Sequence, residues 1–207
     1  MALLAASAAA LGALAAWMWA PVAVPALPTG PPLQVGQLET RERLPEFMLE
    51  ALPRPVTQDS LRGHWTFIYF GYTSCPDACP ATLALLAQVR TALQARGGAA
   101  PRILFISIDP ARDTAAVLQR YAAAFGAGVE AATADPERLR PLLAFFGASF
   151  ERHDGPPGAS PPGAIFDHTS NVFLVTPEAR WLATFPPLAE AAPLLADTAL
   201  LTGAAAR

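Results

Sequence analysis

The chain has 207 residues, of which 53% are hydrophobic, and its side chains give a formal net charge of −3. This length suits one globular domain with an additional segment, and the hydrophobic share is sufficient for a buried core. The chain has no lysine and no run of basic residues, which argues against a nucleic-acid partner because nothing would neutralise successive phosphates. Its two cysteines are too few for a disulfide-rich scaffold, but a close pair is typical of redox and metal-binding proteins.

The N-terminal part of the chain is apolar. Residues 1–27 carry no charged side chain, and Trp17 and Trp19 lie near the end of the uninterrupted apolar stretch. That stretch is about long enough to cross a bilayer, and tryptophan is suited to the membrane interface. We therefore expect residues 1–27 to be a membrane anchor or, alternatively, a cleaved signal segment. Residues 28–44 begin rich in proline and glycine and are expected to be a linker, followed by a domain over residues 45–207.

Hydrophobic periodicity predicts alternating strands and helices within residues 45–207. The predicted strands are residues 47–52, 65–70, 102–108, 149–152, 171–176 and 181–185. The predicted helices begin with a single turn at residues 59–63 and a long helix from about residue 81 to the glycines at 97 and 98. A third helix runs from a cap at residue 113 or 114 to about residue 125. A fourth runs from residue 135 to the glycine at 147, and the last covers residues 188–200. This order indicates a thioredoxin-like fold, an α/β fold with a central sheet flanked by helices.

The most informative stretch is residues 67–80, in which an aromatic and β-branched strand ends in a polar turn that contains Cys75 and Cys79. A helix follows at once, so both sulfurs are expected near a helix N-terminus, where backbone N–H groups favour thiolate over thiol. Four residues apart on one helical face, the two Cα atoms would be roughly 6 Å apart, which permits a disulfide or a shared metal ion. A purely structural disulfide is the weaker interpretation, because so small a loop restricts the unfolded chain little.

Three histidines are available as further metal ligands. His64 is expected at the surface and His153 opens a Pro/Gly-rich loop, whereas His168 lies in a loop before a strand, which the thioredoxin-like topology brings beside the cysteines. Two thiolates and one imidazole suit Cu(I), and can hold Cu(II) with an added oxygen ligand. Zinc stays open, because Asp77 or Asp167 can supply a fourth ligand. Otherwise these aspartates are expected to orient a ligand or tune the sulfurs, or only to cap turns.

Three segments resemble the signature motifs of the SCO/SenC family: residues 69–80, 106–114 and 167–170. They read Tyr-Phe-Gly-Tyr-Thr-Ser-Cys-Pro-Asp-Ala-Cys-Pro, Ile-Ser-Ile-Asp-Pro-Ala-Arg-Asp-Thr and Asp-His-Thr-Ser. The resemblance extends over roughly residues 45–200, with the motifs in the family's order and spacing. Members of this family are membrane-tethered thioredoxin-fold proteins that face the periplasm or the mitochondrial intermembrane space, bind copper and help to metallate cytochrome c oxidase.

The resemblance implies that Cys75, Cys79 and His168 bind copper, as Cu(I) or Cu(II), once the cysteine pair is reduced. It also implies an inner-membrane protein with a periplasmic domain, whose partners are a copper-bearing cytochrome c oxidase subunit and other periplasmic copper carriers or thiol reductases. As a metallochaperone the chain would pass copper on without catalytic turnover. The alternative is a thiol–disulfide oxidoreductase that reduces the cysteines of an oxidase copper site. His168 favours the chaperone, because disulfide exchange does not need it.

Overall fold

The structure is a computed structural model that describes residues 32–153, 165–187 and 190–203. The expected membrane anchor, residues 1–27, and most of the Pro/Gly-rich loop after His153 lie outside these residues. Within the described part of the chain, no helix combines the length and the apolar character needed to cross a bilayer.

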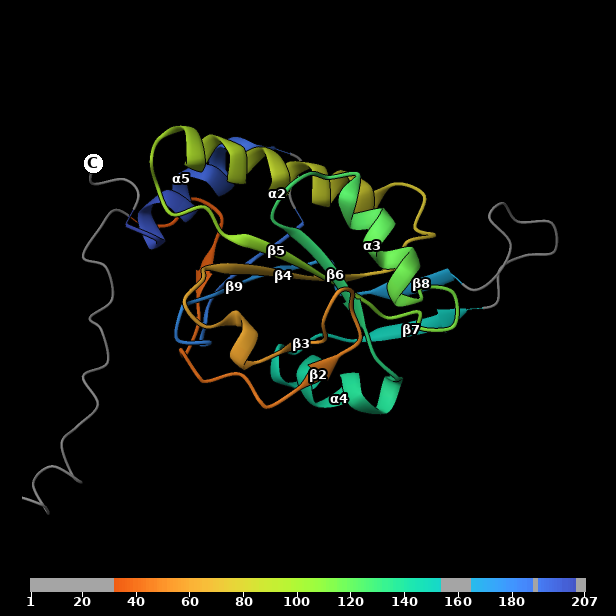
Figure 1. Cartoon of the computed structure of the whole chain (residues 1–207). Helices are drawn as coiled ribbons and strands as arrows, with labels where there is room; N and C mark the ends of the chain where they lie inside the picture. The colour runs from red at the N-terminus through yellow and green to blue at the C-terminus, as the bar shows by residue number, and fades with distance from the viewer. Residues whose placement is uncertain (1–31, 154–164, 188–189, 204–207) are drawn as a thin grey trace, which may run out of the picture. The chain divides into compact units, whose positions relative to one another are not determined.

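A six-stranded sheet forms the centre of the domain, with the strand order β1-β10-β9-β4-β5-β6 (Figure 1). The parallel strands β4, β5 and β6 form one half of the sheet, and the antiparallel hairpin β9–β10 forms most of the other half. The strands are β1 (Gln37–Leu38), β4 (Thr66–Gly71), β5 (Arg102–Ser107), β6 (Val129–Thr133), β9 (Val172–Val175) and β10 (Trp181–Phe185).

Both faces of the sheet are buried, which explains why β4 and β5 read as continuous apolar runs. In β4, Phe67 and Tyr69 pack into one core cluster, while Ile68 and Phe70 pack into the other. The first face is covered by α2 (Ala78–Ala95), α3 (Ala115–Ala123) and α5 (Ala191–Leu201). The second face is covered by α4 (Pro136–Phe145), η1 (Asp59–Leu61), β2 (Met48–Leu49) and β3 (Val56–Thr57) (Figure 1). The predicted α/β architecture, a central sheet flanked by helices, is confirmed.

The structure adds one strand that the sequence did not predict, and it decides between the two candidate caps of helix α3. The sequence does not predict β6 (Val129–Thr133), because its alanines suit a helix as well as a strand, and only pairing with β5 makes it extended. The cap of α3 is Thr114, whose side chain accepts a hydrogen bond from the N–H of Val117 at 3.4 Å. Asp113, the other candidate cap, has different partners, which are described below.

A separate two-stranded sheet holds His168. The strands β7 (Phe150–His153) and β8 (Ile165–His168) pair antiparallel, and His168 is opposite Phe150. The expectation that His168 lies in a loop is therefore corrected: it is the last residue of a strand. In β8 the side chain of Phe166 is buried, whereas those of Ile165 and Asp167 are exposed, so the alternation of a half-buried strand is present but short.

The described chain begins docked against α5. The buried carboxylate of Asp197 accepts hydrogen bonds from the backbone N–H groups of Gln34, Val35 and Gly36 at 2.7, 2.9 and 2.9 Å. Successive N–H groups of this kind form a natural anion-binding concavity. The chain then enters β1, which pairs with β10. Much of the stretch expected to be a linker, residues 28–44, thus packs on the folded domain.

Candidate functional site

The two cysteines lie where β4 gives way to α2. Cys79 is in the first turn of α2 and its side chain is fully buried, whereas Cys75 lies in the preceding turn and is half-buried. Both are free thiols, and the backbone N–H of Cys79 donates to the Sγ of Cys75 at 3.4 Å. The predicted placement of the sulfurs at a helix N-terminus agrees with this geometry.

Gly71 makes room for the buried sulfur. A Cβ atom at this position would lie 2.7 Å from the Sγ of Cys79 and 2.8 Å from the ring of Phe105, both well inside van der Waals contact. Tyr69 contacts the same sulfur, since its hydroxyl donates to Cys79 Sγ at 3.8 Å. Sequence reasoning did not assign Gly71 or Tyr69 to the site, although both belong to the first of the three motif segments.

His168 meets the cysteines from the far end of the chain. Its Nε2 lies 3.8 Å from the Sγ of Cys79, and its Nδ1 lies 3.0 Å from the carbonyl oxygen of Thr169. A carbonyl only accepts hydrogen bonds, so Nδ1 carries a proton, and Nε2 is the ring nitrogen that faces the sulfur. The rings of Tyr69 and Tyr72 contact the imidazole edge-on, at centroid distances of 6.2 and 6.1 Å. His168 therefore presents Nε2 to the buried sulfur, on the side that the expected topology predicted.

The two sulfurs differ in acidity. The hydrogen bond from Cys79 and the backbone N–H groups of Cys79 and Asp77 lower the pKa of Cys75 to about 5, against an opposing effect of burial. The pKa of Cys79 is raised, because its proton is held in the hydrogen bond to Cys75 and its side chain is desolvated. At neutral pH the geometry thus favours a thiolate at Cys75 and a thiol at Cys79.

The separation between Cys79 and His168 suits a shared metal ion. Bonds of about 2.3 Å to sulfur and about 2.0 Å to nitrogen place these two atoms about 3.5 Å apart in tetrahedral and about 3.7 Å apart in trigonal geometry. The observed 3.8 Å is close to both values. In the described residues, no three Cys, His, Asp or Glu side chains already converge as a complete metal site.

Asp113 fixes the loop that carries Cys75. Its side chain is fully buried and accepts hydrogen bonds from the N–H of Thr73 at 2.9 Å, from the hydroxyl of Thr73 and from the hydroxyl of Ser107. Thr73 lies two residues before Cys75, and Ser107 ends β5. The carboxylate thus ties the cysteine loop to the neighbouring strand, a role that sequence reasoning missed because the partners lie 40 residues apart.

Among the described residues, the side chains of Asp77, Asp167 and His64 make no hydrogen bond to either sulfur or to the His168 ring. Asp77 is exposed at the N-cap position of α2, makes no side-chain cap bond, and contributes its backbone N–H to Cys75. Asp167 is exposed and pairs with His153, with 3.0 Å between Oδ2 and Nε2. His64 is exposed at the opposite end of β4, before its first residue. A role of Asp77 or Asp167 in orienting a ligand stays a prediction.

Comparisons with known proteins give one consistent result. A family model described as SCO1/SenC matches residues 38–203. The mitochondrial protein SCO2 homolog of Bos taurus is 34% identical over 136 residues, which make up 63% of this chain and 48% of the bovine protein. The chain thus spans about half the length of that relative.

Two solved structures with copper bound share the fold. ScoI of Arabidopsis thaliana superposes with a TM-score of 0.70 at 25% identity, covering 78% of this chain and 98% of that one. ScoI of Bradyrhizobium japonicum superposes with a TM-score of 0.65 at 28% identity, covering 77% of this chain and 98% of that one.

Proposed function

The chain belongs to the SCO1/SenC family, and we propose that it is a copper metallochaperone which helps to assemble the copper centre of a respiratory cytochrome c oxidase. Cys75, Cys79 and His168 are the proposed ligands, and a copper-bearing oxidase subunit is the proposed recipient. Two copper-bound structures of similar proteins support copper as the cargo.

The observation that carries this proposal is the approach of His168 Nε2 to within 3.8 Å of Cys79 Sγ, across 89 residues of sequence. A redox pair does not need an imidazole beside its buried sulfur, whereas a soft three-ligand site for copper does. The hydrogen bond from His168 Nδ1–H to the Thr169 carbonyl supplies the orientation and basicity that metal-binding imidazoles usually obtain from such a partner.

Release of the cargo would begin at the more accessible of the proposed ligands. Cys79 is fixed inside the domain, while Cys75 is half-exposed in a turn and His168 ends a two-stranded hairpin outside the main sheet. A recipient thiolate or imidazole can therefore replace His168 or Cys75 first, with Cys79 as the last ligand to leave. Each exchange replaces one ligand by another and changes no oxidation state.

The test uses the reduced full-length protein and the variant His168→Ala, with His64→Ala as the matched control. Hydrogen-bond partners of metal ligands are worth about 10- to 100-fold in affinity, so loss of a ligand itself should weaken copper binding by more than about 100-fold. His64→Ala should bind copper like the parent, because His64 is at the other end of β4. Parent-like copper binding and oxidase assembly with His168→Ala would falsify the proposal.

A second candidate function, thiol–disulfide exchange, is favoured by the asymmetry of the cysteines. The half-exposed Cys75 has a lowered pKa and the buried Cys79 a raised one, as expected of an attacking and a resolving thiol. The Cys75 thiolate would attack a client disulfide and release one client thiolate. Cys79, after losing its proton, would displace the second, which leaves a Cys75–Cys79 disulfide and a reduced client. Under this function His168→Ala keeps exchange activity and oxidase assembly while losing copper affinity.

The cellular arrangement is also proposed. Residues 1–27 would hold the protein in the inner membrane as a single N-terminal anchor, and the domain that follows the linker would lie in the periplasm. The uncharged character of residues 1–27 and their length support the anchor.

A further inference from the structure

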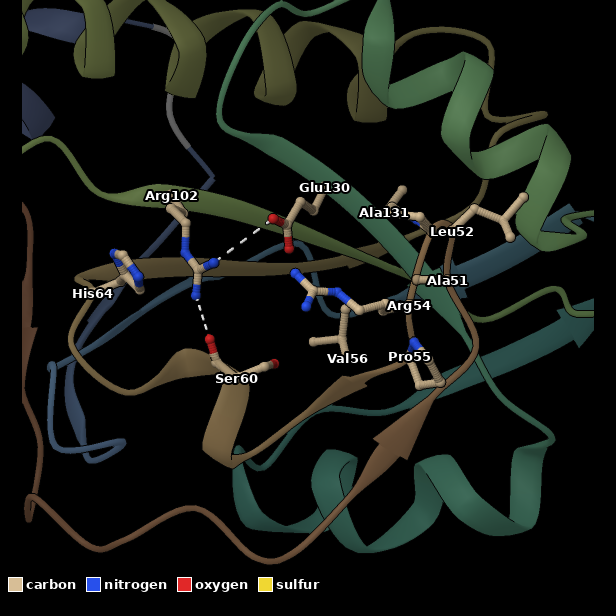
Figure 2. A pocket seen from close by; sticks show the side chains of 11 residues that line it. Ala51, Leu52, Arg54, Pro55, Val56, Ser60, His64, Arg102, Glu130 and Ala131 are labelled. Carbon is tan, nitrogen blue, oxygen red and sulfur yellow. Dashed lines mark hydrogen bonds and ion pairs between the residues drawn. The ribbon is translucent and has the colours of Figure 1, made fainter.

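A cavity lies at the end of the sheet opposite the cysteines. It has a volume of about 500 Å³, which is in the range of small-molecule sites. Its lining includes His64, just before β4, and Arg102, the first residue of β5 (Figure 2). Cys75 and Cys79 instead follow the last residue of β4. The cavity is therefore separate from the candidate copper site.

Arg102 is positioned at the cavity wall by two contacts. Its guanidinium donates to the carbonyl oxygen of Ser60 and lies 3.7 Å from the carboxylate of Glu130 (Figure 2). Only 24% of the side chain is exposed, and its buried Nε has no hydrogen-bond partner among the described residues. Because this Nε has almost no accessible surface, the two terminal nitrogens are the part of the guanidinium that an oxyanion in the cavity can approach.

Arg54 supplies a second guanidinium from the facing loop. The prolines at positions 53 and 55 restrict the backbone on both sides of it, which reduces the entropy lost when this loop binds a ligand. Figure 2 shows the guanidinium of Arg54 extending into the cavity on the side that faces Arg102. Within the described part of the chain, no carboxylate or hydrogen-bond acceptor engages it.

We propose that this cavity binds a small molecule through a phosphate or carboxylate group. Two guanidinium groups face one carboxylate there, so the cavity carries a positive excess on a chain whose net charge is −3. Guanidinium groups bind oxyanions with two parallel hydrogen bonds, which gives Arg54 the role of anchor and Arg102 that of a fixed second donor. The same oxyanion chemistry is offered by a soluble metabolite and by a phospholipid headgroup.

The experiment titrates inorganic phosphate and then citrate into the full-length protein, in copper-free and copper-loaded form, and follows NMR shifts. The side-chain Nε–H signals of Arg54 and Arg102 and the backbone amide of Ala131, which also lines the cavity, should shift with a Kd of about 1 mM or below. Arg54→Gln should weaken binding tenfold or more, since Arg54 is exposed and its replacement leaves the core intact. Arg96→Gln, an equal charge change at an exposed position outside the cavity, should have no effect.

A parallel arm uses vesicles of phosphatidylglycerol or of neutral phosphatidylcholine. Shifts with citrate or phosphate identify a soluble ligand as the source of the oxyanion. Shifts only with phosphatidylglycerol vesicles identify a lipid headgroup. Either result supports the proposal when Arg54→Gln abolishes the shifts. The proposal is overturned if the cavity signals do not respond to any of these probes. Equal weakening by Arg54→Gln and Arg96→Gln also overturns it, because binding would then reflect overall charge.

Discussion

Replacing Asp113 should destabilise the domain to a degree that depends on the replacement. Alanine would leave three donors without an acceptor: the N–H and hydroxyl of Thr73 and the hydroxyl of Ser107. At about 1.5 kcal/mol for each hydrogen bond to a charged group, Asp113→Ala should lower the free energy of unfolding by about 4.5 kcal/mol. Asp113→Asn is the matched control. Its amide oxygen can take the place of Oδ2, which accepts two of the bonds, while its NH₂ group donates to the Thr73 hydroxyl, so the loss should be about 1 kcal/mol.

Urea unfolding of the reduced full-length protein, followed by tryptophan fluorescence, measures both variants. With a typical dependence of about 2 kcal/mol per molar urea, Asp113→Ala should lower the unfolding midpoint by about 2 M and Asp113→Asn by about 0.5 M. The reasoning is refuted if the alanine variant unfolds at the parent's urea concentration, or if both variants lose the same stability. The second result would mean that charge, rather than the number of acceptors, decides the effect.

The remaining predictions concern the cysteines and the N-terminal segment. Alkylation of Cys75 by iodoacetamide should stay fast at neutral pH and fall only as pH drops through about 5, because the lowered pKa keeps the thiolate above that value; a midpoint near the ordinary thiol pKa would contradict this. Gly71→Ala should cost about 1–3 kcal/mol in urea unfolding, because the new Cβ would lie 2.7 Å from Cys79 Sγ, and an unchanged midpoint would show that the sulfur moves freely. The full chain should sediment with membranes and resist carbonate extraction if residues 1–27 are an anchor, whereas a soluble product that begins near residue 22 or 26 would indicate a cleaved signal.

Local sequence patterns predicted the elements whose character is set within a few residues. The aromatic strand, the turn and the amphipathic helix around Cys75 and Cys79 follow from apolar spacing and from the glycines after the helix, and the structure places them as β4 and α2. The strand β6 was not predicted, because an alanine-rich segment does not favour a strand by itself and is extended here because it pairs with β5.

Contacts between distant residues were less accessible to sequence reasoning. The partners of Asp113 could not be predicted, since a buried aspartate beside a helix start resembles a simple cap until the fold brings Thr73 to it. His168 was placed on the correct side of the sheet only through the expected topology. Its position at the end of β8 depends on pairing with β7, across the Pro/Gly-rich segment between them.

The docking of residues 34–36 on Asp197 has a consequence for how far the domain can travel. A free linker over residues 28–44 would reach roughly 60 Å at full extension, whereas residues 28–33 alone reach roughly 20 Å. If residues 1–27 are held in a membrane, the buried carboxylate of Asp197 on α5 therefore reduces the length of free chain between the anchor and the domain to about a third. The radius within which the protein can search for a recipient would then be set by Asp197, a residue that contacts none of the candidate ligands.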